Sequence, residues 1–502
     1  MTEPVLIVGA GPTGLVLALF LRHLGIPFRI IDKLPGPGLA SRAMVIHART
    51  LEFYRQIGID QTVIHAGIRM RGIGLWASSR RIAQYDFDQI GDDLSPFPYV
   101  LSLPQDDHER LLVEELARLG VQVEWNTELT AFTDGPTVSA TIRRDGIEST
   151  TDFRYLCACD GAHSTVRQLL GLGFPGGTYN QVFFVTDVDA RGLNFDEGVN
   201  ISFTSAAILL AFPVRSRGTY RFIGIVPPHV KEPLKATIED IRPLLHSQLN
   251  AAVQQVHWFS AYRVHHRVVE HFRRGNVFLA GDACHVHSPA GGQGMNTGIG
   301  DAVNLAWKLA AALQDRASPQ ILDSYEPERL AFARTLVETT DRVFESVVSP
   351  GPASALIRSI IVPYIIPLAL RLRAVRRAQF RLISQTRIRY PHSPLTSLQA
   401  SSPRAGDRLP WLPHLDNFAP LRSLDWQIHV CGTPSPALAA LATNRRLTLL
   451  NFPASPQAAR AGFSDGHACL VRPDGYIACS THAADTSGIA SYLDRWAIRP
   501  RA

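Results

Sequence analysis

Three glycines near the N-terminus have the spacing of a loop that binds a dinucleotide. The run is Gly9-Ala10-Gly11-Pro12-Thr13-Gly14, and Asp32 stands 21 residues after Gly11. Glycines at this spacing permit a tight turn and let the backbone approach a pyrophosphate closely. A helix that begins in the loop would offer free N–H groups to the phosphates, and an acid after the next strand can accept ribose hydroxyls. The alternative is a glycine-rich turn that binds nothing.

The elements that must position this loop can be predicted from the flanking sequence. Residues 4–9 form a continuous apolar run typical of a buried parallel strand, and residues 12–24 have helical periodicity that stops at Gly25. A second apolar run, residues 28–31, ends directly before Asp32. Together they predict a βαβ unit. With strand, helix and acid in place, the motif predicts a dinucleotide site at Gly9, Gly11, Pro12, Thr13, Gly14, Asp32 and Lys33.

Further motifs follow two short predicted strands. Cys159-Asp160-Gly161-Ala162-His163-Ser164-Thr165-Val166-Arg167 comes after residues 155–158, and Gly281-Asp282-Ala283-Cys284-His285 comes after residues 277–280. The run Pro289-Ala290-Gly291-Gly292-Gln293-Gly294-Met295-Asn296-Thr297-Gly298 then leads into an apolar helix predicted for residues 301–313. Open α/β sheets bind ligands at the carboxyl ends of their strands. Three such ends, separated by long insertions, predict a large and extended ligand.

Taken together, these motifs resemble the FAD-dependent aromatic-ring monooxygenases, the family of para-hydroxybenzoate hydroxylase, phenol hydroxylase and the polyketide hydroxylases. The resemblance covers nearly the whole chain, and the combination of D-G-x-x-S-x-V-R, G-D-A-x-H and the glycine-rich loop is highly specific. It implies a monooxygenase that consumes O₂ and NAD(P)H and hydroxylates a phenolic or polycyclic aromatic substrate, polyketides included, through a flavin C4a-hydroperoxide. NADPH is the family's usual reductant, but the sequence leaves NADH open.

The resemblance also implies roles for individual residues. Asp160 and Gly161 lie in the motif that the family uses for both FAD and NAD(P)H, and Asp282 would bond a hydroxyl of the ribityl or ribose part of FAD. Pro289 would stand near the carbon that reacts with oxygen and is the one residue assigned to the catalytic centre. Arg42 would pack beside the pyrophosphate and flavin, and Gln105 would make a polar contact to the cofactor. The edge of the flavin would be lined by the run Gly292, Gln293, Gly294, Met295 and Asn296.

Two other functions are compatible with an FAD fold. A flavin-dependent halogenase would carry a W-x-W-x-I-P motif and a lysine near its substrate, but the motif is missing and the chain has only four lysines, Lys33, Lys231, Lys235 and Lys308. A flavoprotein that binds an aromatic ligand without turnover would keep the cofactor motifs. NADPH consumption that rises when substrate is added would distinguish the monooxygenase from both alternatives.

Composition narrows the class of protein further. The chain has 502 residues, 46% hydrophobic and 19% charged, with a net charge of +6, and it has no basic stripe interleaved with aromatic residues, so no nucleic-acid partner is expected. Residues 355–370 are apolar, but Arg358, Pro363 and Pro367 interrupt them and they are shorter than the ~20 residues that a membrane span needs. This segment predicts a packed helix pair, with a basic amphipathic helix on a membrane surface as the alternative.

Histidines and cysteines do not predict a metal site or a disulfide framework. His285 and His287, with His265 and His266 upstream, have no acidic or cysteine partner at ligand spacing, so no metal is expected. The six cysteines contain no C-x-x-C pair, which indicates reduced thiols and a cytoplasmic protein, and the N-terminus has no signal-peptide pattern.

The predicted architecture is α/β, with a Rossmann-like FAD-binding domain, an inserted antiparallel-sheet substrate domain and a C-terminal thioredoxin-like domain. Leu470-Val471-Arg472-Pro473-Asp474-Gly475-Tyr476 resembles a turn in the thioredoxin-like tail of the phenol hydroxylase branch, where a structural role, in dimer contacts or in covering the flavin, is expected. A homodimer is left open. The expected boundaries are 1–175 for the first part of the FAD domain with a substrate-side insertion at about 70–105, 176–265 for the substrate domain, 266–390 for the second FAD part with its helices, 391–414 for a linker and 415–502 for the tail.

Periodicity predicts further elements inside these domains. Helices are expected at residues 111–119 and 327–347, a strand at 121–125, and a hairpin at 137–153 that turns at Asp145-Gly146. The antiparallel sheet is expected to contain strands at 181–188, 199–212 and 220–226. In the tail, strands are expected at 427–430, 447–451 and 467–471.

Overall fold

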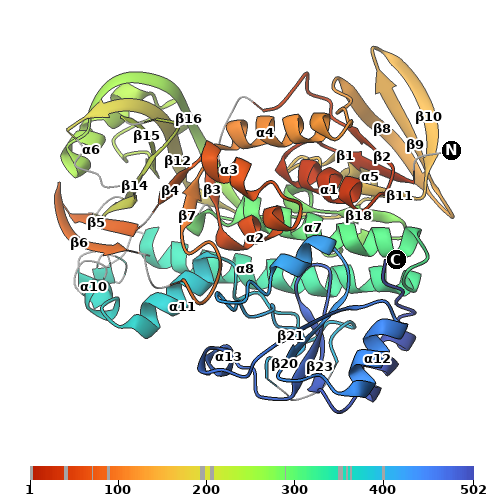
Figure 1. The fold of residues 1–502 in the computed structure, drawn as a ribbon. Helices are drawn as coiled ribbons and strands as arrows, with labels where there is room; N and C mark the ends of the chain where they lie inside the picture. Colours follow the sequence, from red (N-terminus) through yellow and green to blue (C-terminus); the bar gives the residue numbers. More distant parts are fainter. Residues whose placement is uncertain are drawn as a thin grey trace.

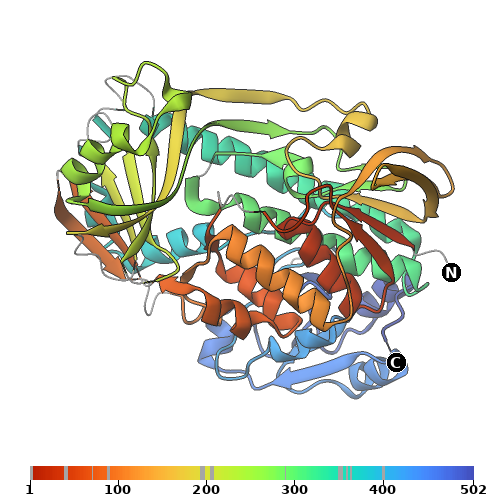
Figure 2. The same ribbon diagram turned by 90° about the horizontal axis from the view of Figure 1, so that it is seen from above.

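The computed structural model of the chain describes most of its residues. These are 4–38, 43–70, 72–77, 79–86, 91–192, 198–203, 208–216, 218–288, 290–348, 354, 356–357, 360–361, 365–397 and 402–501. Figures 1 and 2 show three regions: a central part with the N-terminal elements, a large sheet to one side of it, and a C-terminal domain against its lower face. The α/β fold class is confirmed.

A five-stranded sheet with the order β17–β18–β11–β1–β2 lies in the central part. The β1, β2, β11 and β18 strands run parallel, whereas β17 is antiparallel to β18. Strands β1, β11 and β18 are buried along their whole length, which explains why their sequences are continuously apolar. The bounds are β1 Val5–Val8, β2 Phe28–Ile31, β11 Tyr155–Ala158, β17 Arg273–Arg274 and β18 Val277–Leu279.

Helices pack around this sheet. Helix α1 packs against α7 and α4, and α7 also contacts α2 and α8. The bounds are α1 Pro12–His23, α2 Ala48–Gln56, α3 Asp60–Ala66, α4 Gln105–Arg118, α5 Thr165–Leu169, α7 Gly294–Leu313 and α8 Tyr325–Val348. Two small three-stranded sheets complete the region: β3 Val45–Ile46, β7 Val100–Ser102 and β4 Ile68–Met70, then β8 Thr127–Asp134, β9 Val138–Arg144 and β10 Ile147–Phe153.

Several predicted elements of this region are confirmed and others are wrong in part. The β9–β10 hairpin turns at Asp145-Gly146 as expected. Helix α7 begins seven residues before the expected start at Asp301, because the glycines of its first turns resemble a loop. Residues 121–125 form no strand; a single bridge joins Glu124 to Ile31.

The large sheet has eight strands in the order β19–β16–β12–β15–β14–β13–β5–β6. The expected strand at 199–212 is wrong, because β13 and β14 are two strands that pair antiparallel. The sheet is not separate from the central part either, since β19 comes from the G-D-A-x-H segment and pairs with β16. Helix α6, Ile238–Leu249, packs on the sheet. The strand bounds are β5 Gly72–Ala77, β6 Arg80–Asp86, β12 Gly176–Arg191, β13 Val199–Phe203, β14 Ile208–Pro213, β15 Thr219–Ile225, β16 Ala252–Val268 and β19 His285–Val286.

The C-terminal domain has a four-stranded sheet with the order β21–β20–β22–β23. Strands β20 and β21 are parallel and joined by a helix, whereas β22 and β23 form an antiparallel hairpin. The hydrophobic core of the central part continues into this domain, where Trp307 meets Trp426 with ring centroids 5.7 Å apart. Helices α10 Ile366–Ala369 and α11 Arg373–Ile383 precede this domain in the chain. The bounds of its own elements are β20 Gln427–Cys431, α12 Pro436–Asn444, β21 Thr448–Phe452, α13 Pro456–Arg460, β22 His467–Val471, β23 Ile477–His482 and α14 Ser487–Arg495.

Candidate functional site

The carboxyl ends of the parallel strands bring the predicted dinucleotide motifs together. Val8 pairs with both Ile31 and Ala158, so the residues that follow all three strands lie side by side. A cavity of about 300 Å³ opens at this edge. Seven of the residues expected to contact the cofactor line it: Gly9, Gly11, Asp32, Lys33, Gln105, Asp160 and Gly161.

The three motif glycines have different physical roles. A Cβ on Gly9, whose φ is +104°, would lie 2.3 Å from the carbonyl oxygen of Cys159, and a Cβ on Gly14 would lie 1.9 Å from the carbonyl oxygen of Gly9. These two glycines are therefore required by the packing of the fold itself. A Cβ on Gly11 would meet nothing within 4 Å, although Gly11 lines the cavity. The fold itself therefore does not require a glycine at position 11, whereas a ligand that approaches the backbone closely would.

Asp32 holds the glycine loop in place. Its Oδ2 accepts a hydrogen bond from the amide of Ala10 at 2.7 Å, and its Oδ1 accepts one from the amide of Leu34 at 2.8 Å. Each carboxylate oxygen has a second lone pair. The side chain is half-buried in the cavity wall, so it can also accept hydroxyl groups of a ligand.

Asp160 offers an unused acceptor to the cavity. Its Oδ2 accepts from the amide of Val166 at 3.2 Å, whereas its buried Oδ1 has no hydrogen-bond partner among the described residues. Burial raises the pKa of this carboxyl group, although hydrogen bonds from neighbouring groups oppose that shift. A buried acceptor without a partner is costly, so this atom fits a hydroxyl donor of a bound cofactor.

Gln105 and Glu109 form the far wall. Gln105 accepts from the amide of Ala43 through Oε1 at 3.3 Å and donates through Nε2 to Glu109 Oε1 at 2.8 Å. Glu109 also accepts from the amide of Gly38 at 2.9 Å. Glu109 was not predicted from the sequence, although its position one helical turn after Gln105 in α4 was a usable signal. The predicted Arg42 lies outside the described residues.

The second part of the site is the loop at residues 291–296, where α7 begins. Gly291 and Gly292 have φ values of +75° and +62°, and a Cβ on Gly292 would lie 2.9 Å from Cβ of Val45. No side chain caps α7, so the amides of Gly294, Met295 and Asn296 have no acceptor within the helix. Gly294 and Met295 are half-buried. These amides can donate to the carbonyl oxygens of a flavin pyrimidine ring.

The side chains of Gln293 and Asn296 are used inside the protein. Asn296 accepts from the amide of His47 at 2.9 Å and donates to the carbonyl oxygen of Val45 at 2.8 Å. Gln293 donates to the carbonyl oxygen of Ile383 at 3.1 Å and accepts from Gln385 at 2.7 Å. Both side chains therefore fix the loop, which leaves its backbone to contact the cofactor.

Two neutral histidines flank the loop, and the sequence analysis assigned neither of them to it. His47 Nε2 lies 3.0 Å from the carbonyl oxygen of Gly291 and 3.2 Å from that of Gly292, so Nε2 carries the proton. His287 Nδ1 lies 2.8 Å from the carbonyl oxygen of Ser288. Burial lowers the pKa of each imidazole to about 4. His47 Nδ1 and His287 Nε2 have no partner among the described residues.

The G-D-A-x-H segment is anchored by a buried charge network. Asp301 accepts from His285 Nε2 at 2.8 Å, from the amide of Gly281 at 3.0 Å and from Arg329 Nε at 2.6 Å. Burial alone would raise the pKa of Asp301, but the charges of Arg329 and His285 hold it below its usual value. Asp282 itself is exposed.

Thr13, Pro12 and Gly14 begin α1 and do not line the cavity. The Thr13 side chain packs between Gly281 and Gly298, where added Cβ atoms would lie 2.5 and 2.4 Å from its hydroxyl oxygen. Thr13 therefore packs between the G-D-A-x-H segment and the first turns of α7. Pro289 lies outside the described residues.

Cys284, His285 and Asp301 are the one group among the described residues with the geometry of three metal ligands, and all three are buried. Arg329 already neutralises the Asp301 carboxylate.

No helix in the part of the chain that the structure describes is both long enough and apolar enough to cross a bilayer.

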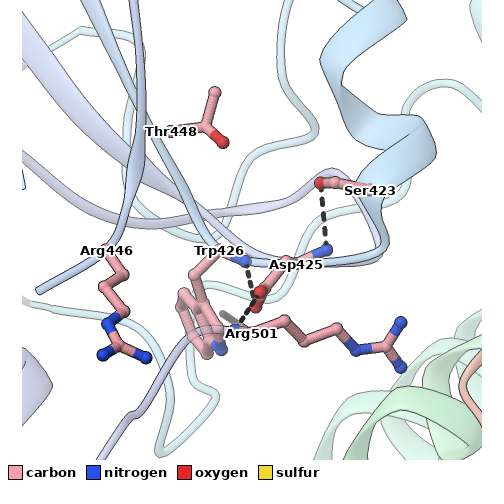
Figure 3. Close-up of a pocket in the computed structure, with 6 residues that line it drawn as sticks. All are labelled: Ser423, Asp425, Trp426, Arg446, Thr448 and Arg501. Carbon is pink, nitrogen blue, oxygen red and sulfur yellow. Dashed lines mark hydrogen bonds between the residues drawn. The ribbon is translucent and has the colours of Figure 1, made fainter.

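A second cavity lies elsewhere, at the C-terminal domain. It has a volume of about 660 Å³, and Figure 3 shows the six residues that line it: Ser423, Asp425, Trp426, Arg446, Thr448 and Arg501. None of them belongs to the predicted cofactor site. The smaller cavity at the strand ends is the candidate site, because the glycine loop, the unpaired Asp160 oxygen and Asp32 all meet there.

These features together define a class of protein. A parallel sheet with a glycine loop, a second loop at a helix N-terminus and unpaired acceptors between them fit the two ends of FAD. The sequence matches the family described as "FAD binding domain" over residues 2–340, which is more than half of the chain. The chain therefore belongs to this family and binds FAD.

Curated relatives and solved structures agree on the class of enzyme. The chain is 35% identical to 6-methylpretetramide 4-monooxygenase of Streptomyces rimosus over 78% of this chain and 71% of that one. It is 34% identical to pentachlorophenol 4-monooxygenase of Sphingobium chlorophenolicum over 69% and 65% of the two chains. The structure of an anhydrotetracycline hydroxylase from Streptomyces rimosus covers 100% of both chains with a TM-score of 0.78 and 31% identity. The chain is thus an FAD-dependent monooxygenase, and the halogenase alternative is not favoured.

Proposed function

We propose that this enzyme uses NAD(P)H and O₂ to hydroxylate a phenolic or polycyclic aromatic compound, and that a polyketide is its substrate. The observation that carries the proposal is an apolar cluster between the large sheet and the loop at residues 291–296, the flavin loop. Val45, which contacts Gly292, is packed in it with Met44, Met70, Val185, Phe212 and Ile223. Trp258 and Tyr262, which are half-buried, lie at its margin.

The cluster supplies the environment that oxygen transfer needs. Bound FAD supplies the redox chemistry and the activation of O₂. The apolar side chains exclude water, which limits the loss of reducing equivalents as hydrogen peroxide. Aromatic rings such as those of Trp258 and Tyr262 can stack against a multi-ring substrate.

A buried ion pair holds the large sheet against the central part. Arg221 donates to both carboxylate oxygens of Asp187, at 2.6 and 2.8 Å, and to the carbonyl oxygen of Ala43 at 3.3 Å. Arg215 adds a contact between Asp187 and Asp106 of α4. In this proposal these arginines fix the position of the large sheet relative to the segment that precedes Met44 and Val45. They thereby position the substrate over the flavin loop.

Relatives that match nearly the full chain support a polyketide substrate. The enzyme named 12-dehydrotetracycline 5-monooxygenase/anhydrotetracycline 6-monooxygenase, from Streptomyces rimosus subsp. rimosus, is 33% identical over 99% of both chains.

The same proposal includes the cofactor-binding roles of the residues named above, the domain boundaries and a catalytic role for Pro289. We also propose a cytoplasmic location, because all six cysteines are free and buried. A homodimer stays a prediction.

The decisive test combines labelled dioxygen with product analysis. Purified holoenzyme is assayed with NADPH or NADH against a panel of phenols and tetracyclic aromatic polyketides in ¹⁸O₂. We expect one labelled oxygen atom in the product and NAD(P)H oxidation that is faster with substrate. Label from water, chlorination of the ring, or NAD(P)H oxidation that no aromatic compound accelerates would contradict the proposal.

The Pro289 assignment needs a separate experiment. Replacing Pro289 with leucine should divert electrons to hydrogen peroxide and lower the product formed per NADPH, while FAD stays bound. Unchanged coupling in P289L would remove Pro289 from the site.

A further inference from the structure

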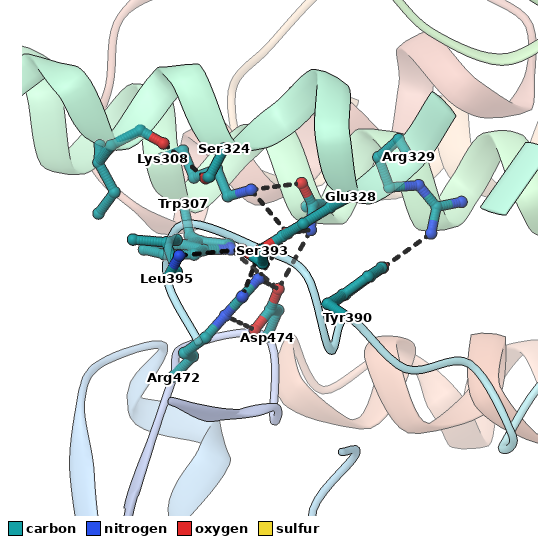
Figure 4. A network of polar contacts seen from close by, with 12 residues as sticks. Trp307, Lys308, Ser324, Glu328, Arg329, Tyr390, Ser393, Leu395, Arg472 and Asp474 are labelled. Atoms are coloured by element: carbon teal, nitrogen blue, oxygen red, sulfur yellow. Dashed lines mark hydrogen bonds and ion pairs between the residues drawn. The ribbon is translucent and has the colours of Figure 1, made fainter. Parts of the chain in front are cut away.

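The turn between β22 and β23 inserts buried charges into the FAD-binding part of the molecule. Arg472 and Asp474 are 1% and 2% exposed, although both belong to the C-terminal domain. Figure 4 shows them pointing from the turn toward α7 and α8. Arg472 donates to both oxygens of Glu328 in α8, at 2.6 and 2.9 Å, and to Asp474 at 2.6 Å.

Asp474 contacts α7 through its carboxylate. Trp307 Nε1 donates to Oδ2 of Asp474 at 3.1 Å, and Asn304 Nδ2 approaches the same oxygen at 3.5 Å. Asn304 also accepts from Lys308 at 2.8 Å, and Lys308 donates to Glu328 at 2.8 Å. The turn thus contacts two side chains of α7 directly, and Lys308 joins the network through Asn304 and Glu328.

The same residue contacts α2 through its backbone. Arg49 of α2 donates to the carbonyl oxygen of Asp474 at 2.6 Å and to Glu52 at 2.8 Å. The guanidinium group of Arg49 also lies 5.0 Å from the ring centroid of Tyr476, at the end of the turn. Asp474 therefore bridges two helices, α2 by its carbonyl group and α7 by its carboxylate.

Helices α2 and α7 both hold the flavin loop. Thr50, the residue after Arg49, donates to Asn296 at 2.8 Å, and the His47 ring contacts the carbonyl oxygens of Gly291 and Gly292. Asn296 in turn donates to the carbonyl oxygen of Gly292 at 3.0 Å. The helices are thus joined at the flavin loop through Asn296 and again further along through Asp474.

We propose that Asp474 and Arg472 are positioning residues for the flavin loop, through which the C-terminal domain sets the spacing of α2 and α7 and hence the placement of the α7 amides. A helix transmits a displacement at one end to the other because its hydrogen-bonded backbone is stiff. In this role the C-terminal domain tunes the flavin environment without touching the cofactor. The proposal rests on FAD binding and does not depend on the identity of the aromatic substrate.

A second aspartate offers a matched control. Asp425, shown in Figure 3, also belongs to the C-terminal domain and also pairs with an arginine of the central part, Arg316, at 3.0 and 3.1 Å. It accepts from the backbone amide of Trp426 at 2.8 Å. Arg316 follows the carboxyl end of α7, so Asp425 ties the domains together on the far side from the flavin loop. Among the described residues, Asp425 forms no hydrogen bond or ion pair with α2.

The experiment compares Asp474→Asn, Asp425→Asn and wild type as full-length proteins. For each, apoprotein is titrated with FAD, the absorption and fluorescence spectra of bound flavin are recorded, and the unfolding temperature is measured. We expect D474N to raise the Kd for FAD about two- to thirtyfold and to shift the flavin spectrum. We expect D425N to lower the unfolding temperature while the Kd and the spectrum stay at wild-type values.

Arg49→Met tests the same link from the α2 side and keeps the proposal testable if D474N fails to fold. It removes the donor to the Asp474 carbonyl group but leaves Asp474 and α7 intact. The spectral shift in R49M should match that in D474N, and the double variant should add little, because both changes break one connection. Wild-type flavin properties in R49M, or equal flavin changes in D474N and D425N, would overturn the proposal. Failure to find an aromatic substrate would leave these flavin measurements unaffected and would count only against the proposed function.

Discussion

Thr50 donates its hydroxyl hydrogen to Oδ1 of Asn296 over 2.8 Å, and each side chain is 1% exposed. This bond joins α2 to the first turn of α7 across 246 residues of sequence. Asn296 has three further partners, the amide of His47 and the carbonyl oxygens of Val45 and Gly292. The flavin loop is therefore held by several contacts within the protein.

Replacing Asn296 with alanine should weaken both the fold and the cofactor site. Several buried groups would lose their partner at once, for which we expect a loss of about 3 kcal/mol in the free energy of unfolding. T50V removes a single bond and should cost about 1 kcal/mol. Urea unfolding of the apoproteins and FAD titration measure the two effects. Wild-type affinity for FAD in N296A would show that the loop does not contact the cofactor.

Gly11 and Gly14 should respond in opposite ways to a larger side chain. Gly14→Ala forces its Cβ to within 1.9 Å of the Gly9 carbonyl oxygen and should cost at least about 3 kcal/mol of stability. Gly11 has φ −73° and ψ −178°, which other residues adopt freely, and its Cβ direction is open. G11V should therefore fold as stable apoprotein but fail to retain FAD. Thermal unfolding and flavin content check both variants, and a G11V protein that binds FAD normally would contradict the expected pyrophosphate approach.

Lys308 should make stability depend on pH in the alkaline range. Burial lowers its pKa to about 8, although the neighbouring Glu328 carboxylate opposes the shift. The unfolded chain has the higher pKa, so the folded state carries a penalty that is complete below about pH 8 and is relieved as pH rises toward 10.5. The penalty is on the order of 3 kcal/mol.

Lys308→Met isolates this effect. The unfolding free energy of wild type minus that of K308M should increase between about pH 8 and 10.5, since only the wild type loses the buried charge. Chemical unfolding at several pH values gives the difference, in which the other titrating groups largely cancel. A difference that does not change with pH would show that the pKa of Lys308 is the same in the folded and unfolded states.

The thioredoxin-like domain should have no disulfide reductase activity. All six cysteines are free and buried, and burial raises the pKa of both Cys469 and Cys479, so their thiols stay protonated. An insulin-reduction assay should show no turnover, and Ellman's reagent should react with six thiols only after unfolding. Turnover that disappears in C469A or C479A would contradict this prediction.

The sequence by itself determined the elements whose signals are local. The βαβ unit, the strands before Asp160 and Asp282, and the β9–β10 hairpin all follow from apolar runs, glycines and a turn dipeptide within short windows. A dinucleotide site also follows from these local motifs, whereas FAD as the cofactor is what their resemblance to the FAD-dependent monooxygenases implies. Helix α4 begins six residues before its expected start, although Asp106 and Asp107 in its first turn are acidic residues of the kind that favour a helix N-terminus.

Only the tertiary structure decided how these elements act together. The split of residues 199–212 into β13 and β14, the pairing of β19 with β16, and the bridge that Asp474 forms between α2 and α7 depend on partners far away in the chain. Such contacts produce no periodic pattern in the sequence. Charged residues are mostly exposed, so the sequence alone does not show that Arg49 and Glu328 are buried. Burial also determines charge states, as at Lys308 and His47, and burial is a property of the folded chain alone.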